Sequence, residues 1–143
     1  MVGTRRLELL TSNHPKAGST ALKVTFTPSS TKNYATVTQT VTLVVNPTST
    51  STAITSELPN PSTAGQKVTI HFTVTPATNY SEPTGSVTVN ATTGESCKAT
   101  LSVGSAYCSI TFSSRGTRSV TATYSGDSNN TSSVSNTVSQ AVN

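Results

Sequence analysis

The stretch "QKVTIHFTVTP", residues 66–76, alternates apolar and polar side chains over almost its whole length. Its threonines and His71 share one face, and the opposite face holds Val68, Ile70, Phe72 and Val74. Alternation with a period of two predicts a strand that is buried on one side and exposed on the other. The first expectation is therefore an antiparallel sheet with one face packed on a core.

Similar short stretches occur before and after this one, separated by Gly, Ser, Asn and Pro. They are "STAITSEL" (51–58), "GSVTVNA" (85–91), "CKATL" (97–101), "YCSITF" (107–112), "RSVTATY" (118–124) and "VSNTVSQAV" (134–142). About seven short strands with turn signals between them are typical of an immunoglobulin-like β-sandwich. We therefore predict an all-β fold, although the Cys, Trp, Cys pattern of antibody domains is missing.

The composition fits strands better than helices and argues against several functions. Charged residues make up 10% of the 143 residues and aromatic residues 5%, and Trp is absent. The net charge of +4 is far below that of a strong nucleic-acid binder, and the cations are scattered, as on solvated strand faces. No apolar run approaches the roughly 18 residues of a membrane helix, so we expect no membrane span. The opening "MVGTRRLELL" indicates neither a signal peptide nor an anchor.

An internal repeat links the first third of the chain to its end. Residues 21–45 can be laid over residues 119–142, with Phe26 over Tyr124 and Val41 over Val138 at offsets of 98 and 97 residues. One sandwich length separates the two copies. The repeat predicts a partial Ig-like repeat ending in a hairpin at residues 1–46, a linker at 47–52 and a complete domain at 53–143. Residues 1–19 have no assignment within this scheme.

Several of these stretches resemble a known family. "PTGSVTV" (83–89), "CKATLSVGSAYCSITF" (97–112) and above all "GTRSVTATYSGDSN" (116–129) are similar to the bacterial Ig-like repeat domains of large cell-surface and secreted proteins. The resemblance covers residues 48–142, and residues 22–45 resemble the end of a related repeat. It implies a non-catalytic β-sandwich that serves as a spacer, stalk or adhesion module at the cell surface or outside the cell.

The only two cysteines, Cys97 and Cys108, lie in neighbouring predicted strands. Strand parity puts Cys97 on the apolar face of its strand, and a hairpin that turns near Ser102 and Val103 sets it opposite Cys108, within bonding distance. A zinc site needs four ligands, and a Cys-x-x-Cys redox motif is absent. We predict a disulfide, with two free buried thiols as the main alternative and metal or redox chemistry as the remaining one. A disulfide implies an oxidising compartment.

A cation site is the second candidate. The stretch "SGDSNN" (125–130) has the composition of a turn, but two loops of an Ig-like sandwich share one pole. Glu82 and Asn79 can therefore approach Asp127 and Asn129 there. Oxygen ligands of this kind suit Ca²⁺ or Mg²⁺, although two carboxylates are few for such a site.

Two further hypotheses concern function. A metal-dependent hydrolase of nucleic acid on an Ig-like scaffold would use Asp127, Glu82 and His71, whereas the simpler interpretation of His71 is a solvated side chain on an outer strand face. The sequence has neither a Gly-rich phosphate loop nor a nucleophile elbow, so a non-catalytic structural module is favoured. Adhesion to a glycan or protein ligand through a threonine-rich sheet face is the third possibility.

The predicted hairpin of residues 21–28 and 36–46 has one apolar face. Its members are Leu22, Val24, Phe26, Val37, Val41, Leu43 and Val45. A two-stranded hairpin cannot bury such a face by itself, and its edges offer unpaired backbone groups. We therefore expect self-association through residues 1–46, as a homodimer or a higher assembly.

Overall fold

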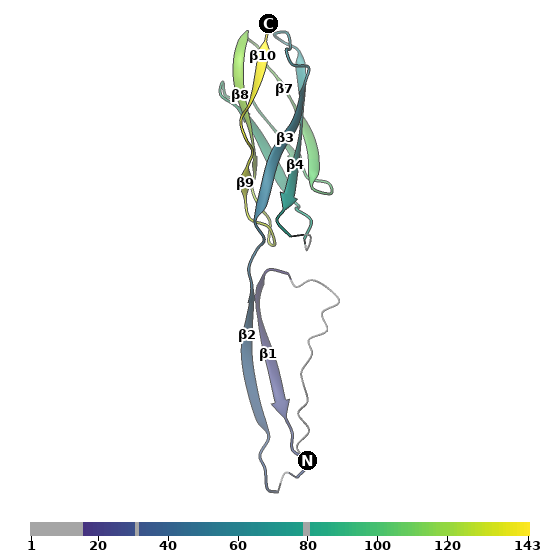
Figure 1. Ribbon diagram of the computed structural model, residues 1–143, viewed down its shortest axis with the longest axis vertical. Helices are drawn as coiled ribbons and strands as arrows, with labels where there is room; N and C mark the ends of the chain where they lie inside the picture. Colours follow the sequence, from purple (N-terminus) through teal and green to yellow (C-terminus); the bar gives the residue numbers. More distant parts are fainter. Residues whose placement is uncertain (1–15, 31, 79–80) are drawn as a thin grey trace. The chain divides into compact units, whose positions relative to one another are not determined.

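The computed structural model describes residues 16–30, 32–78 and 81–143, and the chain divides into two compact units, residues 1–45 and 46–143. The described residues form strands and turns, and none of them belongs to a helix that is long and apolar enough to cross a membrane. The first unit contains β1 (Gly18–Phe26) and β2 (Val37–Val45) (Figure 1). The second contains β3 (Thr50–Leu58), β4 (Lys67–Pro76), β5 (Ser86–Ala91), β6 (Ser96–Thr100), β7 (Ser105–Thr111), β8 (Gly116–Tyr124), β9 (Ser133–Val134) and β10 (Val138–Val142).

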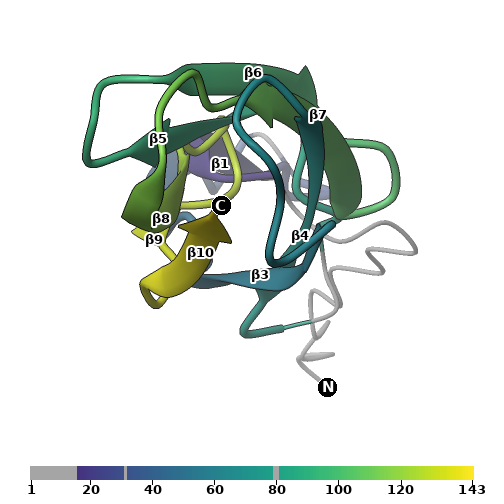
Figure 2. The same ribbon diagram turned by 90° about the horizontal axis from the view of Figure 1, so that it is seen from above.

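The second unit is a sandwich of two antiparallel sheets. One sheet has the order β3-β4-β7, and the other has the order β10-β8-β5-β6, with β9 also paired to β8. Viewed from above, these strands surround a common interior (Figure 2). The buried core draws on both sheets, and its largest fully buried rings are Tyr124, Phe72 and Phe112. The predicted all-β, Ig-like sandwich is therefore confirmed.

The alternation in β4 accounts for the way this strand lies in the sandwich. Its four apolar side chains are at most 3% exposed, whereas His71 on the other face is exposed. The same alternation buries Val87 and Val89 on β5, and Val120 and Ala122 on β8. Burial of such side chains contributes about 1.5–3 kcal/mol each for the larger ones, so the pattern of period two is the main source of the fold's stability.

The last predicted strand is in fact two, because the chain carries one extra residue there. Thr123 pairs with Val134, whereas Val120 pairs with Val138, so four steps on one strand face three on the other. This is a β-bulge. Ser135 lies at the bulge and is buried; its N–H donates to the Ala122 carbonyl (2.8 Å), and its hydroxyl accepts the Ala122 N–H (2.9 Å). A side chain thus replaces a backbone carbonyl, which alternation alone does not reveal.

Residues 47–52, which we predicted to be a linker, take part in the sandwich. The Thr48 N–H donates to the Asn129 carbonyl (2.8 Å), the Thr131 N–H donates to the Thr48 carbonyl (2.8 Å), and β3 already begins at Thr50. The Ser/Thr-rich composition looks like that of a linker, but Thr is also a good strand former.

The first unit contains a hairpin in which β1 and β2 pair antiparallel from Gly18–Val45 to Phe26–Val37. Among the described residues, these two strands pair only with each other. Their shared apolar face is largely open, with Phe26 63%, Val41 58% and Leu43 37% exposed. Residues 1–15, part of the segment left without assignment, lie outside the described residues.

Candidate functional site

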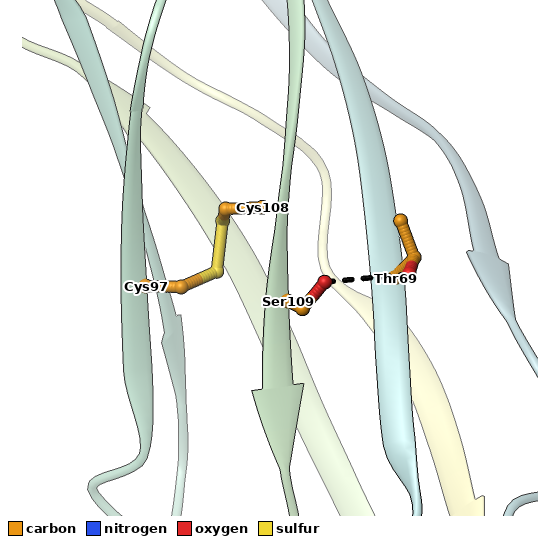
Figure 3. Close-up of a disulfide and its surroundings, with 4 residues drawn as sticks. All are labelled: Thr69, Cys97, Cys108 and Ser109. Atoms are coloured by element: carbon orange, nitrogen blue, oxygen red, sulfur yellow. Dashed lines mark hydrogen bonds between the residues drawn. A yellow bond between two sulfur atoms is a disulfide. The ribbon is translucent and has the colours of Figure 1, made fainter.

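The structure joins Cys97 and Cys108 in a disulfide with a Cα–Cα distance of 5.8 Å (Figure 3). The predicted hairpin geometry around it is wrong in one respect. The turn is where it was expected, with Val103 and Gly104 both at positive φ, but only one bridge, Ser102–Ser105, follows it. Beyond that bridge β6 pairs with β5 and β7 pairs with β4. The disulfide therefore ties one sheet to the other, because the turn lies at the corner where the chain changes sheets.

The residue after Cys108 fixes β7 from its other side. Ser109 points away from the core, and its hydroxyl lies 3.3 Å from the hydroxyl of Thr69 on β4 (Figure 3). The two residues are direct partners in the ladder. This edge of the sandwich is thus held by a covalent bond on the inner face and by a hydrogen bond on the outer face.

The opposite edge is closed by hydroxyl groups, which we call the hydroxyl seam: Thr50 and Thr52 of β3, and Ser133 of β9. The Ser133 hydroxyl lies 2.7 Å from each of the two threonine hydroxyls, and the Thr50 hydroxyl donates to the Thr131 carbonyl (2.8 Å). Thr52 is only 5% exposed. Because β3 and β9 belong to different sheets, the seam is the polar counterpart of the disulfide.

The second unit, residues 46–143, is called the module below. Its last strand, β10, is fixed at the pole opposite to the one where β3 begins. The Ser62 N–H donates to the Ala141 carbonyl (2.9 Å), and the Asn143 N–H donates to the Ser62 carbonyl (2.8 Å). Gln140 is fully buried beneath this contact, where its amide donates to the Pro59 carbonyl (3.0 Å). The loop between β3 and β4 therefore holds β10 in place.

At the pole where the chain enters, the Asp127 carboxylate accepts a set of hydrogen bonds. Its Oδ2 accepts the Thr84 N–H (2.8 Å), the Thr84 hydroxyl (2.7 Å) and the Tyr124 hydroxyl (3.1 Å). Its Oδ1 accepts the backbone N–H groups of Asn129 and Asn130, both at 2.8 Å. The Asn130 side-chain amide approaches both oxygens at 3.1 Å. The carboxylate thus binds the β8–β9 loop to the segment before β5.

These contacts change the acidity of the groups involved. Burial by itself would raise the pKa of Asp127, but the hydrogen bonds from Thr84, Asn129 and Asn130 outweigh it and hold that pKa well below its usual range. Burial first, and then the hydrogen bond to the Asp127 carboxylate, raise the pKa of Tyr124 to about 12. The folded protein therefore keeps Asp127 charged and the Tyr124 hydroxyl protonated over a wide pH range.

The other predicted ligands lie in different surroundings. Glu82 is exposed, and its carboxylate lies beside Gly104 in the β6–β7 turn. A Cβ atom built on Gly104 would be 3.6 Å from Oε2 of Glu82. His71 is exposed on β4 with its ring centre 5.1 Å from that of Tyr107, and Asn79 lies outside the described residues. Over the part of the chain that the structure describes, no three His, Cys, Asp or Glu side chains gather to hold a metal ion. A cation at Asp127 would have to displace the donors that already surround its oxygens.

Arg118 departs from the expectation that the cations lie on solvated faces. It is only 6% exposed, and its guanidinium donates to the carbonyl and hydroxyl oxygens of Ser114, both at 2.8 Å, and to the Arg115 carbonyl (3.2 Å). Gly116 makes room for it, because a Cβ there would come within 2.7 Å of Nη1. This arginine therefore braces the turn before β8.

The outer face of β4 and β7 carries the exposed rings of His71 and Tyr107 side by side, and Tyr107 is 63% exposed. Two shallow hollows flank the nearby turn. One of about 350 Å³ is lined by Ala99, Thr100, Ser102, Ser105, Ala106 and Tyr107. One of about 300 Å³ is lined by residues that include Thr73, Thr75, Ser81, Glu82 and Ser105. An aromatic ring with hydroxyl groups around it is suited to a weak surface contact rather than to enclosing a small molecule.

Two sheets with one buried core, tied at one edge by a disulfide and at the other by hydroxyl groups, define an Ig-like β-sandwich module. The sequence model of the bacterial Ig-like domain (group 3) matches residues 54–143, and the chain belongs to this family. Comparison with curated proteins found no match.

Sequence reasoning did not find the partners of Asp127. One signal was available, because a buried tyrosine hydroxyl needs a partner and Asp127 is the nearest acidic residue to Tyr124 in the sequence. Thr84 had no comparable signal, since it lies 43 residues away from Asp127. Asn130 belongs to a stretch with the composition of an exposed turn, but its side chain is buried, with only 1% of the residue exposed.

Proposed function

We propose that residues 46–143 serve as a non-catalytic spacer module within a larger bacterial surface or secreted protein. The observation that supports this most directly is where the chain enters and leaves. Thr48 is bound at one pole beside Asn129, and Asn143 is bound beside Ser62 and Ala64 at the other (Figure 1). A module with its ends at opposite poles adds its full length to an extended protein.

The two closed edges suit this role. Tension applied at Thr48 and Asn143 runs along the strands, so the sheets resist by shear across many hydrogen bonds rather than by opening one at a time. The disulfide and the hydroxyl seam both oppose separation of the sheets. A disulfide also favours an oxidising compartment, which supports the proposed location at the cell surface or outside the cell.

Single-molecule pulling on the module, held at residues 46 and 143, tests the mechanical part of the proposal. We expect one abrupt unfolding event, and after reduction a length gain larger by about 30 Å. The increase arises because the disulfide locks 11 residue steps at a Cα–Cα distance of 5.8 Å, whereas an extended chain covers about 3.3–3.6 Å per residue. The double variant Cys97→Ala, Cys108→Ala is the control and should show the longer gain without reductant. Gradual extension without an unfolding event would contradict the spacer role.

Location is tested separately, by labelling intact cells of the source bacterium with an antibody raised against the module. Labelling without permeabilisation, or recovery from the medium, is the expected result. Labelling only after permeabilisation would contradict the proposed location while leaving the mechanical role to the pulling experiment.

Adhesion is the second candidate, and the exposed ring of Tyr107 is the observation that favours it. Binding of a glycan or protein ligand on this face should be weak and should be lost in Tyr107→Ala. Thr88→Ala, on the outer face of β5 in the other sheet, is the matched control. The nuclease hypothesis gains no support from the positions of Asp127, Glu82 and His71. Incubation with nucleic acid and Mg²⁺, Mn²⁺ or Ca²⁺ should give no cleavage.

A further inference from the structure

The β1–β2 hairpin repeats the pairing of β8 with β10. When the two segments are aligned by the internal repeat, their ladders have the same register from Gly18 to Leu22. Beyond Leu22 they differ, because β2 continues along β1 to Phe26 without a bulge, whereas the bulge at Ser135 shifts β9 by one residue along β8. The equivalent pairs are Gly18–Val45 with Gly116–Val142, and Leu22–Val41 with Val120–Val138. A shift of one residue would have put the apolar set on the opposite face, so a shared register preserves which side chains face inward.

The backbone supports the same equivalence without reference to side-chain pattern. Gly18 and Gly116 each begin the first strand of their pair, and both have a positive φ, +143° and +129°. Residues with a side chain rarely adopt this conformation. The two hairpins therefore begin with the same unusual backbone conformation at the same aligned position.

The two hairpins differ in what covers them. Tyr124 and Val120 are fully buried in the module, whereas the aligned Phe26 is 63% exposed and Leu22 is only partly buried. In the module, the inner face of β8 packs in the same core as the apolar side chains of β4 and β7. The edge of β8 that faces away from β10 pairs with β5 from Val120 to Tyr124. Both kinds of contact are missing from the described part of the first unit.

We propose that the β1–β2 hairpin is the closing pair of strands of a second Ig-like sandwich, and that its apolar face is a docking surface for the complementary half of that sandwich. The occupant is an Ig-like half-sandwich of the kind formed by β3 to β7. Its three-stranded sheet covers the face, and its β5-type strand pairs along β1 from Leu22 to Phe26. This proposal is independent of the location and mechanical role proposed above.

Self-association of two hairpins, which the sequence led us to expect, is the competing arrangement. Packing face to face would leave all four outer strand edges unpaired, and pairing edge to edge would leave the apolar faces open. The module shows that a half-sandwich covers the face and pairs the edge of β8 at once, which is why we favour it as the occupant.

The test is a tandem protein in which a second copy of residues 46–115 is joined to Gly18 of residues 18–143, so that β1 and β2 follow strands of the β3–β7 kind. We expect a monomer by light scattering, a second cooperative unfolding transition, and amide exchange in β1 and β2 slowed by at least about 100-fold relative to the 143-residue chain. Phe26→Asp on the docking face should abolish the slowing. Thr25→Asp, on the opposite face of the same strand, should retain it.

Three results would overturn the proposal. The first is exchange in β1 and β2 that is as fast in the tandem protein as in the 143-residue chain. The second comes from a companion tandem protein in which Leu22→Val, Val24→Ala and Phe26→Tyr restore the residues of β8. If only this companion gains the second transition, or if neither protein gains it, the natural hairpin does not accept these strands. The third is a stable dimer of the 143-residue chain with β1 and β2 already protected, which would assign the face to self-association.

Discussion

The Ser135 hydroxyl accepts the N–H of Ala122 at 2.9 Å, at the point where an unbroken strand would offer a backbone carbonyl. The same hydroxyl donates to the Asn136 carbonyl (2.8 Å), so both of its hydrogen-bonding roles are used. Ala122 is fully buried, and its N–H therefore has no access to water. One side chain thus allows β9 and β10 to bulge without leaving a buried donor unpaired.

Replacing this side chain should be costly. We expect Ser135→Ala to lower the free energy of unfolding by about 1–3 kcal/mol, because the buried Ala122 N–H loses its acceptor. Urea denaturation measures the effect, and Ser139→Ala, at an exposed position of β10, is the control. Equal midpoints for the two variants would show that the bulge does not depend on the hydroxyl.

Asp127 should make stability depend on pH in the acid range. Its pKa is lower in the folded protein than the ordinary value of 3.8, so its contribution is fully present above about pH 4 and is lost as the pH falls through the folded-state pKa. We expect Asp127→Asn to be less stable than the native chain by about 1–3 kcal/mol at pH 7, with the difference shrinking below pH 4. A difference that stays constant down to pH 2 would contradict this role.

Tyr124 should act in the alkaline range. Its pKa rises on folding from 10.0 to about 12, so the folded state holds the proton more firmly than the unfolded state. The stability it contributes is present below pH 10 and is lost as the pH rises towards 12. Tyr124→Phe should therefore lose less stability between pH 9 and pH 11 than the native chain does, as followed by denaturant titration. Parallel pH profiles for the two proteins would exclude Tyr124 as the cause.

The disulfide should stabilise the module by roughly 3 kcal/mol, the value expected for a loop of this size from the chain-entropy model. Calorimetry before and after reduction measures it, and mass spectrometry of the unreduced protein should show Cys97 bonded to Cys108. The double alanine variant controls for effects of the reductant on the rest of the chain. Two thiols that react freely in native, air-exposed protein would contradict both the bond and the argument for an oxidising compartment.

The alternation of apolar and polar residues was enough to predict the class of fold and which face of each strand is buried, because successive side chains of a strand point to opposite faces of the sheet. It placed Cys97 and Cys108 on inner faces, and the internal repeat placed the hairpin of β1 and β2. Parity does not say to which sheet a strand belongs, however, so the disulfide's passage between sheets was not predictable. That choice depends on β7 pairing with β4, a contact between segments distant in the sequence.

The role of Asp127 could not be predicted for a different reason. Asp and Asn serve equally as turn residues and as oxygen ligands, so the stretch of residues 125–130 fits both interpretations. What distinguishes them is the direction of the surrounding groups. Thr84 and Asn130 present N–H and O–H donors to the carboxylate, and these come from another loop and from a buried side chain.

The hydroxyl seam offers the last test, because the chain contains a matched pair within a single sheet. The Thr52 and Ser133 hydroxyls join the two sheets at 2.7 Å where Thr52 is buried, whereas the Thr69 and Ser109 hydroxyls meet at 3.3 Å within one sheet. A double-mutant cycle with Thr52→Val and Ser133→Ala isolates the coupling across the seam, and Thr69→Val with Ser109→Ala gives the reference.

We expect about 1 kcal/mol for the seam and less for the reference pair, because Thr52 is buried whereas Thr69 and Ser109 are both only half-buried, and a hydrogen bond that is better shielded from water contributes more. The Thr52→Val variant should also unfold at lower force when the module is pulled by its ends, because β3 then slides more easily past β9. A seam coupling no larger than that of the reference pair would mean that the hydroxyl groups add little to the hold that the shared core and the disulfide have on the two sheets. Tension on the module would then be resisted by the strand ladders and not by the hydroxyl groups between sheets.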